Sequence, residues 1–202
     1  MINNALYRRA TFLLAVQHLN QLPEQFTCEV GFAGRSNAGK SSAINTVTGI
    51  SSLARTSKTP GRTQQIVYFS LDETRALVDL PGYGFAKVPP KVKEQWGRLM
   101  EGYFEHRPQL KGLVLVMDVR HPMRDFDEQM LVWCQHAGTP VHVLLTKADK
   151  VSKNEGSSTR LKVEKMIREM NIDNTEVQLF SSLKRTGSEI VVNKLNQWFK
   201  IA

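Results

Sequence analysis

The octapeptide GRSNAGKS, residues 34–41, is the feature that most constrains this chain. It follows the apolar run FTCEVGFA without a break and matches the pattern G-x-x-x-x-G-K-[ST] at every fixed position. Glycines let the backbone curl so that successive N–H groups point at phosphate oxygens, and a helix that begins here adds its positive N-terminal end. The alternative is a glycine turn that includes Lys-Ser by chance, and the strand-like run before it argues against that. The octapeptide therefore predicts a phosphate-binding loop.

Two side chains of this loop carry specific expectations. Lys40 is expected to reach the β- and γ-phosphates of a bound triphosphate and to be catalytic. Ser41 is expected to offer its hydroxyl to Mg²⁺, which takes few protein oxygens and keeps water and phosphate as its other ligands.

Strand-like and helix-like segments alternate along the chain from residue 26 onward. Apolar runs predict strands, and amphipathic runs that end at Gly49 and Gly138 predict helices. Such alternation implies a mainly parallel sheet with helices on both faces. We therefore predict an α/β fold, a three-layer α/β/α P-loop NTPase with a six-stranded, mostly parallel sheet and one antiparallel strand. The predicted strands are 26–34, 64–71, 74–80, 110–119, 140–146 and 175–180, and the predicted helices are 39–49, 91–107, 124–138, 157–170 and 187–200.

The 202 residues suit one domain, with residues 1–24 as an N-terminal extension packed on it and residues 26–202 as the nucleotide-binding core. The run RRATFLLAV, residues 8–16, is too short for a signal peptide and lacks a small-residue cleavage site. No apolar run approaches about 18 residues, and Cys28 and Cys134 fit buried thiols in a reducing compartment. We expect a cytoplasmic protein that does not engage a membrane.

Short motifs at later strand ends indicate the base. In DLPG, residues 79–82, Asp79 is placed to hold Mg²⁺ through water, and the Gly82 amide is placed near the γ-phosphate. In TKAD, residues 146–149, the Asp149 carboxylate matches the two N–H donors of guanine, a pair that adenine lacks. Lys147 can cover the base face, and a backbone N–H of SSL, expected to be that of Ser182, can donate to guanine O6. Together these motifs predict guanine nucleotide, GTP or GDP, as the ligand.

Five stretches together resemble the EngB (YsxC/YihA) family of the translation-factor-related class of P-loop GTPases: GRSNAGKSS, KTPGRTQQI, DLPGYGFA, TKADK and FSSLKRTG. The resemblance covers nearly the whole chain and implies a single G domain. It also implies a bacterial GTPase that takes part in assembly of the large ribosomal subunit and whose loss is associated with defects in cell division and septation.

The same resemblance implies roles for a switch region. Thr63 would be the switch threonine, a catalytic residue whose hydroxyl reaches Mg²⁺ when the γ-phosphate is present, although an ordinary loop threonine is the alternative. Residues 61–65 would close over the nucleotide, and residues 82–90 would form the second switch. The expected metal ligands are Ser41 and Thr63, and the expected catalytic residues are Lys40, Thr63 and Gly82. The residues expected to contact the nucleotide are Gly34, Arg35, Ser36, Asn37, Ala38, Gly39, Lys40, Ser41, Gly61, Arg62, Thr63, Gln64, Gln65, Asp79, Leu80, Pro81, Gly82, Thr146, Lys147, Ala148, Asp149, Phe180, Ser181 and Ser182.

Three residues depart from or add to the general GTPase pattern. Tyr83 follows DLPG where Ras-like enzymes carry the glutamine that orients water, so intrinsic hydrolysis should be slow. Thr146 stands where many GTPases carry Asn, and its hydroxyl can still tether this loop to the phosphate loop. Asn37 is similar to the asparagine that coordinates K⁺ in potassium-activated relatives, or it simply caps the loop backbone.

The charge of the chain suggests a partner. With 27 Lys and Arg against 19 Asp and Glu, the net charge is +8, which favours an anionic partner such as nucleic acid. Basic residues gather at 87–98, beside the second switch, and at Arg55, Lys58 and Arg62, whereas the basic segment 153–165 is more simply a solvated face. We expect a monomer that docks on the rRNA of the large subunit, with no DNA partner.

Two alternatives stay open from the sequence. One is a P-loop nucleotide kinase or ATPase, which would prefer ATP to GTP. The other is a GTP-dependent scaffold for division or signalling proteins that does not bind ribosomes, since a net charge of +8 also suits acidic proteins.

Overall fold

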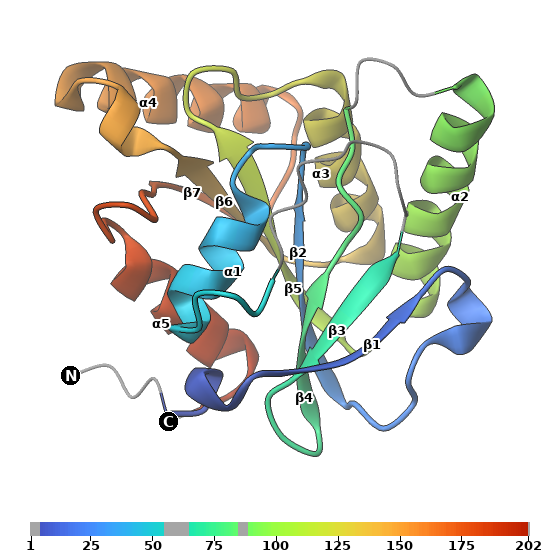
Figure 1. Ribbon diagram of the computed structural model, residues 1–202. Coiled ribbons are helices and arrows are strands. Elements are labelled where there is room, and N and C mark those ends of the chain that lie inside the picture. The colour runs from blue at the N-terminus through green and yellow to red at the C-terminus, as the bar shows by residue number, and fades with distance from the viewer. Residues whose placement is uncertain (1–4, 55–64, 85–88, 202) are drawn as a thin grey trace.

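The computed structural model describes residues 5–54, 65–84 and 89–201, and its central element is a seven-stranded sheet with the order β1-β3-β4-β2-β5-β6-β7 (Figure 1). The strands are β1 (Thr11–Val16), β2 (Cys28–Gly34), β3 (Ile66–Ser70), β4 (Arg75–Asp79), β5 (Leu110–Asp118), β6 (Val141–Thr146) and β7 (Thr175–Leu179). The helices are α1 (Lys40–Thr48), α2 (Pro90–His106), α3 (Asp125–Ala137), α4 (Lys153–Glu169) and α5 (Ser188–Trp198).

The sheet is mostly parallel, as predicted. Strands β4, β2, β5, β6 and β7 pair in parallel, and β3 runs antiparallel to both of its neighbours, β1 and β4. The β3–β4 hairpin closes through Asp72, whose carboxylate accepts hydrogen bonds from the backbone N–H groups of Thr74 (2.9 Å) and Arg75 (2.8 Å). The α/β class and the three-layer P-loop NTPase fold are therefore confirmed.

The predicted number of strands, six, is wrong, because the N-terminal segment supplies a seventh. Strand β1 pairs with β3 from Thr11↔Ser70 to Val16↔Ile66, with one irregularity between Phe12 and Leu14. The local sequence of β1 is a weak signal because much of it faces solvent, and the Phe12 side chain is 61% exposed. What makes this segment a strand is the free edge of β3, a partner fifty or more residues away in sequence.

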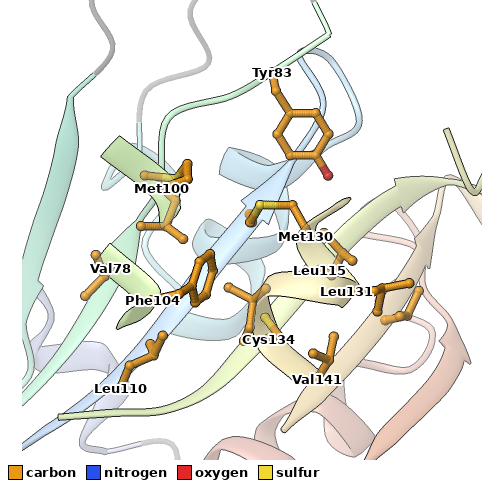
Figure 2. Packing of buried hydrophobic residues seen from close by; sticks show 14 of the residues in the cluster. Val78, Tyr83, Met100, Phe104, Leu110, Leu115, Met130, Leu131, Cys134 and Val141 are labelled. Atoms are coloured by element: carbon orange, nitrogen blue, oxygen red, sulfur yellow. The ribbon is translucent and has the colours of Figure 1, made fainter. Parts of the chain in front are cut away.

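Each face of the sheet carries its own apolar layer. One layer joins α2, α3 and α4 to the sheet; Met100 and Met130 belong to it (Figure 2), and so does Val163 of α4. The other joins α1 and α5 through residues such as Ile44 and Leu195. Side chains of β5 alternate between the two layers, as the two-residue period of a strand requires. The helices thus cover both faces and leave the carboxyl edge of the sheet to loops (Figure 1).

A buried ion pair lies below this edge. Glu29 of β2 is fully buried, and its carboxylate accepts hydrogen bonds from the Arg107 guanidinium at 2.5–3.2 Å. The hydroxyls of Tyr68 and Tyr103 also donate to it, at 3.2 and 3.1 Å. The pair fastens the end of α2 to the centre of the sheet, far along the strands from the phosphate loop.

Within the described part of the chain, none of the helices has the length and apolar character needed to cross a membrane.

Candidate nucleotide-binding site

The predicted phosphate loop connects β2 directly to α1. Asn37 and Gly39 both have positive φ, 63° and 101°, and these two left-handed residues produce the curl of the loop. Gly34 lies so close to β5 that a Cβ there would stand 2.6 Å from the carbonyl oxygen of Val116. The loop therefore has the strand–turn–helix course that allows its N–H groups to converge on an anion.

Lys40 and Asp79 meet above this loop. Strand β4 lies beside β2, with Asp79 in register with Phe32, so the carboxylate comes to the first turn of α1. There Asp79 Oδ1 contacts Lys40 Nζ as an ion pair that is largely shielded from solvent. Ser41 is the next residue of α1. A serine hydroxyl and a carboxylate are the hard oxygen donors that suit Mg²⁺, so these residues fit the predicted metal.

Gly82 lies directly against the phosphate loop. A Cβ on Gly82 would be 3.7 Å from both the carbonyl oxygen of Gly34 and the amide nitrogen of Ser36. The Ser36 N–H donates to the carbonyl of Tyr83 at 2.8 Å. Gly82, whose amide is predicted to lie near the γ-phosphate, is therefore next to the phosphate loop. Leu80, which was also predicted to contact nucleotide, is fully buried, and its side chain packs in the apolar core.

The TKAD segment is fastened to the other side of the same loop. The Thr146 hydroxyl donates to the carbonyl of Ala38 at 2.5 Å, with the carbonyl of Met117 3.0 Å away. Lys147, with φ 58°, extends across the loop, and its Nζ donates to the carbonyl of Asn37 at 2.7 Å. The tether expected from the Thr146 hydroxyl is therefore present.

Asp149 is held in place by the segment that follows β7. The Ser181 hydroxyl donates to Asp149 Oδ1 at 2.5 Å and holds the pKa of that carboxyl below its usual range. The carbonyl of Phe180 accepts a hydrogen bond from the Ala148 N–H at 3.1 Å, which ties the two segments together. The Phe180 side chain is fully buried, and Ser182 follows at the partly exposed rim. The predicted guanine-reading residues therefore lie side by side.

Asp118, at the end of β5, belongs to this cluster and was missed by the sequence analysis. Its carboxylate accepts from the Arg120 guanidinium at 2.6 and 2.9 Å and pairs with Lys147 Nζ at 2.9 Å. Partial burial alone would raise the pKa of Asp118, but hydrogen bonds from Arg120 and Lys147 hold the pKa well below its usual range. The signal was available, since Asp118 ends a buried apolar strand just as Asp79 does.

A pocket opens beside the loop between these strand ends and α3. Its lining includes Arg35, Asn37, Asp118, Asp127 and Lys147. Asp127 is also buried, and burial raises the pKa of its carboxyl. Sequence reasoning gave no role to Asp127, which lies in an ordinary amphipathic helix pattern.

Several predicted residues lie outside the described part of the chain. These are Gly61, Arg62, Thr63 and Gln64 of the first switch, together with Arg55 and Lys58 and the 85–88 part of the second switch. Gln65 is described, and it immediately precedes β3.

Comparison with known proteins agrees with this geometry. A family model described as 50S ribosome-binding GTPase matches residues 29–147, which is more than half of the chain. Among solved structures, a probable GTP-binding protein EngB is similar over 87% of this chain and 100% of its own, at 22% identity and a TM-score of 0.69. The bacterial selenocysteine-specific elongation factor EF-Sec is similar over 87% of this chain but 29% of its own, at 19% identity and a TM-score of 0.61.

A GTP-binding protein from Sulfolobus solfataricus, in complex with GDP, is similar over 85% of this chain and 52% of its own, at 21% identity and a TM-score of 0.55. At these identities the solved structures establish the shared fold, in agreement with the EngB-like kinship that the motifs predict. The family match also decides against a nucleotide kinase or ATPase. The chain belongs to the 50S ribosome-binding GTPase family.

Proposed function

We propose that this protein is a slow GTPase that acts as a switch in assembly of the large ribosomal subunit. The observation that carries the proposal is the convergence of three strand ends on one phosphate loop. Asp79 at the end of β4 pairs with Lys40, and Thr146 at the end of β6 is tethered to Ala38. Ser181, after β7, donates to Asp149 at the adjoining rim.

In this proposal the phosphate loop and Lys40 bind the polyphosphate, and the Gly82 amide contacts the γ-phosphate. Lys40 leaves Asp79 to bind phosphate, because the ammonium is the group that offsets charge on the β- and γ-oxygens. Mg²⁺, when bound, supplies further positive charge to these oxygens. Ser41, and Asp79 through water, would hold it, together with Thr63, which lies outside the described residues.

Guanine is proposed to be recognised at the rim. Asp149 accepts from the two N–H donors of the base, and Ser181 fixes the carboxylate in the orientation that this requires. Lys147 covers the base face, with its ammonium held by Asn37 and Asp118, and the Ser182 N–H donates to O6. An adenine in this place would leave the Asp149 carboxylate without its donors.

Hydrolysis is proposed to be slow because Tyr83, where Ras-like enzymes have glutamine, is only 3% exposed and turned into the protein. We further propose that Asn37 supports a K⁺ ion beside the phosphates, where its charge would act in place of an arginine finger. Equal turnover in K⁺ and Na⁺ at the same ionic strength would refute the ion.

The proposed partner is the rRNA of the large subunit. The family description and the net charge of +8 support it, as do the exposed lysines Lys91 and Lys93 at the start of α2, the helix that follows the second switch. A basic surface next to a switch makes RNA affinity depend on the bound nucleotide, through phosphate neutralisation alone. We propose that GTP favours docking on the large subunit and that hydrolysis favours release. We also propose that the protein is a cytoplasmic monomer, and that the link to cell division follows from its role in subunit assembly.

The test is co-sedimentation of the protein with purified large subunits, in the presence of a non-hydrolysable GTP analogue or of GDP at physiological salt. Greater retention with the analogue is expected. Equal retention with both nucleotides would refute a nucleotide-dependent switch, and absence of retention with either would favour the scaffold alternative.

A further inference from the structure

The residue that replaces glutamine after DLPG has an unusual set of contacts. The Tyr83 ring points into the apolar layer under α2 and α3 (Figure 2) and packs against Trp96 and Phe126, with ring centroids 5.3 and 5.8 Å apart. Its hydroxyl donates to Asp127 Oδ1 at 2.6 Å. Because the Tyr83 side chain is turned into the core, it cannot position a water molecule at the γ-phosphate as the Ras-like glutamine does. Its contacts point instead to a structural role beside the phosphate loop.

Asp127 is a rigid acceptor for this hydroxyl. It occupies the third position of α3, and its second carboxylate oxygen, Oδ2, accepts at 2.9 Å from the backbone N–H of Arg124, the residue before the helix. The residue is 1% exposed. Both oxygens of the carboxylate are therefore engaged, one by its own helix and one by Tyr83, which fixes Tyr83 to the start of α3.

The segment is anchored on its other side by α2. Trp96 Nε1 donates to the carbonyl of Pro81 at 3.2 Å, and Trp96 is 2% exposed. Gly82 lies between these two anchored residues and against the loop, where the carbonyl of Tyr83 accepts from the Ser36 N–H at 2.8 Å. The two neighbours of Gly82 are thus held by buried polar contacts to different helices: Pro81 to α2 through its carbonyl, and Tyr83 to α3 through its hydroxyl.

We propose that Tyr83, Asp127 and Trp96 are positioning residues that hold the Gly82 amide at the phosphate loop and thereby set the preference of the protein for GTP over GDP. The inference rests on the proposed function, because it assumes that Gly82 contacts the γ-phosphate. GDP has no γ-phosphate and makes no use of the Gly82 amide. An amide that is already in place binds the γ-phosphate without the cost of ordering a loop, so loosening the anchors should weaken GTP selectively.

The test is a comparison of dissociation constants for a non-hydrolysable GTP analogue and for GDP in Tyr83→Phe. The substitution removes one hydroxyl and keeps the ring packing. We expect the affinity for GDP to change less than twofold and the affinity for the analogue to fall about three- to tenfold, as for loss of one buried hydrogen bond. The KM for GTP should rise more than kcat falls.

Two further variants separate positioning from general stability. Trp96→Phe removes the anchor on the other side of Gly82 and should shift the ratio of the two dissociation constants in the same direction. Tyr68→Phe is the matched control, because the Tyr68 hydroxyl also donates to a buried carboxylate, that of Glu29, away from the loop. It should lower the melting temperature without changing the ratio.

The inference is overturned if Tyr83→Phe leaves the ratio unchanged, or if Tyr68→Phe changes it equally. Failure of the parent protein to bind either nucleotide would overturn both this inference and the proposed function, so the two failures are distinguishable.

Discussion

At the scale of single residues, the proposed choice of base rests on one carboxylate, that of Asp149, and neighbouring side chains fix its position. Asp149 was predicted from four letters of sequence, but the Ser181 hydroxyl that orients it comes from a segment thirty-two residues away. Asp118 likewise holds Lys147 through an ion pair, and no local sequence pattern predicts that these two residues pair. Residue types were therefore predictable, whereas their partners depended on which strand ends become neighbours.

Replacement of Asp149 by Asn should exchange the purine that is recognised. The amide presents one acceptor and one donor, which clashes with guanine but suits xanthine. We expect Asp149→Asn to weaken GDP binding by about 2–3 kcal/mol, roughly 30- to 150-fold, and to gain affinity for xanthosine diphosphate. Undiminished GDP binding in a fluorescence titration, with no gain for xanthosine diphosphate, would contradict the proposed site.

Removal of the Ser181 hydroxyl should make guanine binding sensitive to acid. The hydroxyl holds the pKa of Asp149 below its usual range, and only the ionised carboxylate accepts from both guanine donors. In Ser181→Ala the pKa should rise, so GDP binding should fail at a higher pH on acidification than in the parent protein. Near neutral pH we expect about fivefold weaker binding. Ser157→Ala, at an exposed position of α4, is the control, and coincident pH profiles of all three proteins would refute this role.

At the scale of elements, strands and helices were predicted closely because their apolar periodicity is strong and local. Helix α4 is an instructive difference: it begins at Lys153, four residues before the predicted start, because Ser152 and Glu155 form a capping box. The weak strand β1 became part of the sheet through pairing with β3. Boundaries therefore followed caps and partners rather than hydrophobicity.

The contact between α2 and the sheet should depend on Arg107. Its guanidinium is the cation that faces the buried Glu29 carboxylate, with closest contact at 2.5 Å. Arg107→Leu leaves that carboxylate buried with only tyrosine hydroxyls as partners, and should lower the free energy of unfolding by about 3–5 kcal/mol in urea. Arg98→Leu on the same helix breaks only an exposed pair with Glu94 and should cost about 0.5 kcal/mol or less. Equal decreases in the free energy of unfolding in the two variants would show that the buried Glu29–Arg107 pair contributes no more to stability than the exposed Glu94–Arg98 pair.

At the scale of the whole molecule, the fold places the nucleotide motifs among the described residues on one edge of the sheet. The basic surfaces of α2 and α4 lie outside that edge. The two helices lie on the same face of the sheet, yet only α2 follows the second switch. A partner that senses the nucleotide should therefore depend on α2 more than on α4.

Charge reversal tests this expectation. Lys91→Glu with Lys93→Glu on α2 should reduce retention on large subunits with the GTP analogue by roughly tenfold or more, since two phosphate contacts become repulsive. The matched pair Lys162→Glu with Arg168→Glu on α4 changes the net charge equally and should have a much smaller effect. GDP affinity, measured in parallel, reports whether each variant keeps its site. Equal losses on α2 and α4 would indicate attraction by net charge alone.

The sequence by itself determined the phosphate loop, the choice of guanine-type motifs and the alternation of strands and helices, because each of these rests on short-range backbone geometry or on a fixed residue chemistry. Only the tertiary structure decided that Tyr83 turns inward to Asp127, that Ser181 reaches Asp149 and that β1 completes the sheet. These contacts join residues tens of positions apart, and their partners are set by strand order and helix packing, which no local pattern encodes.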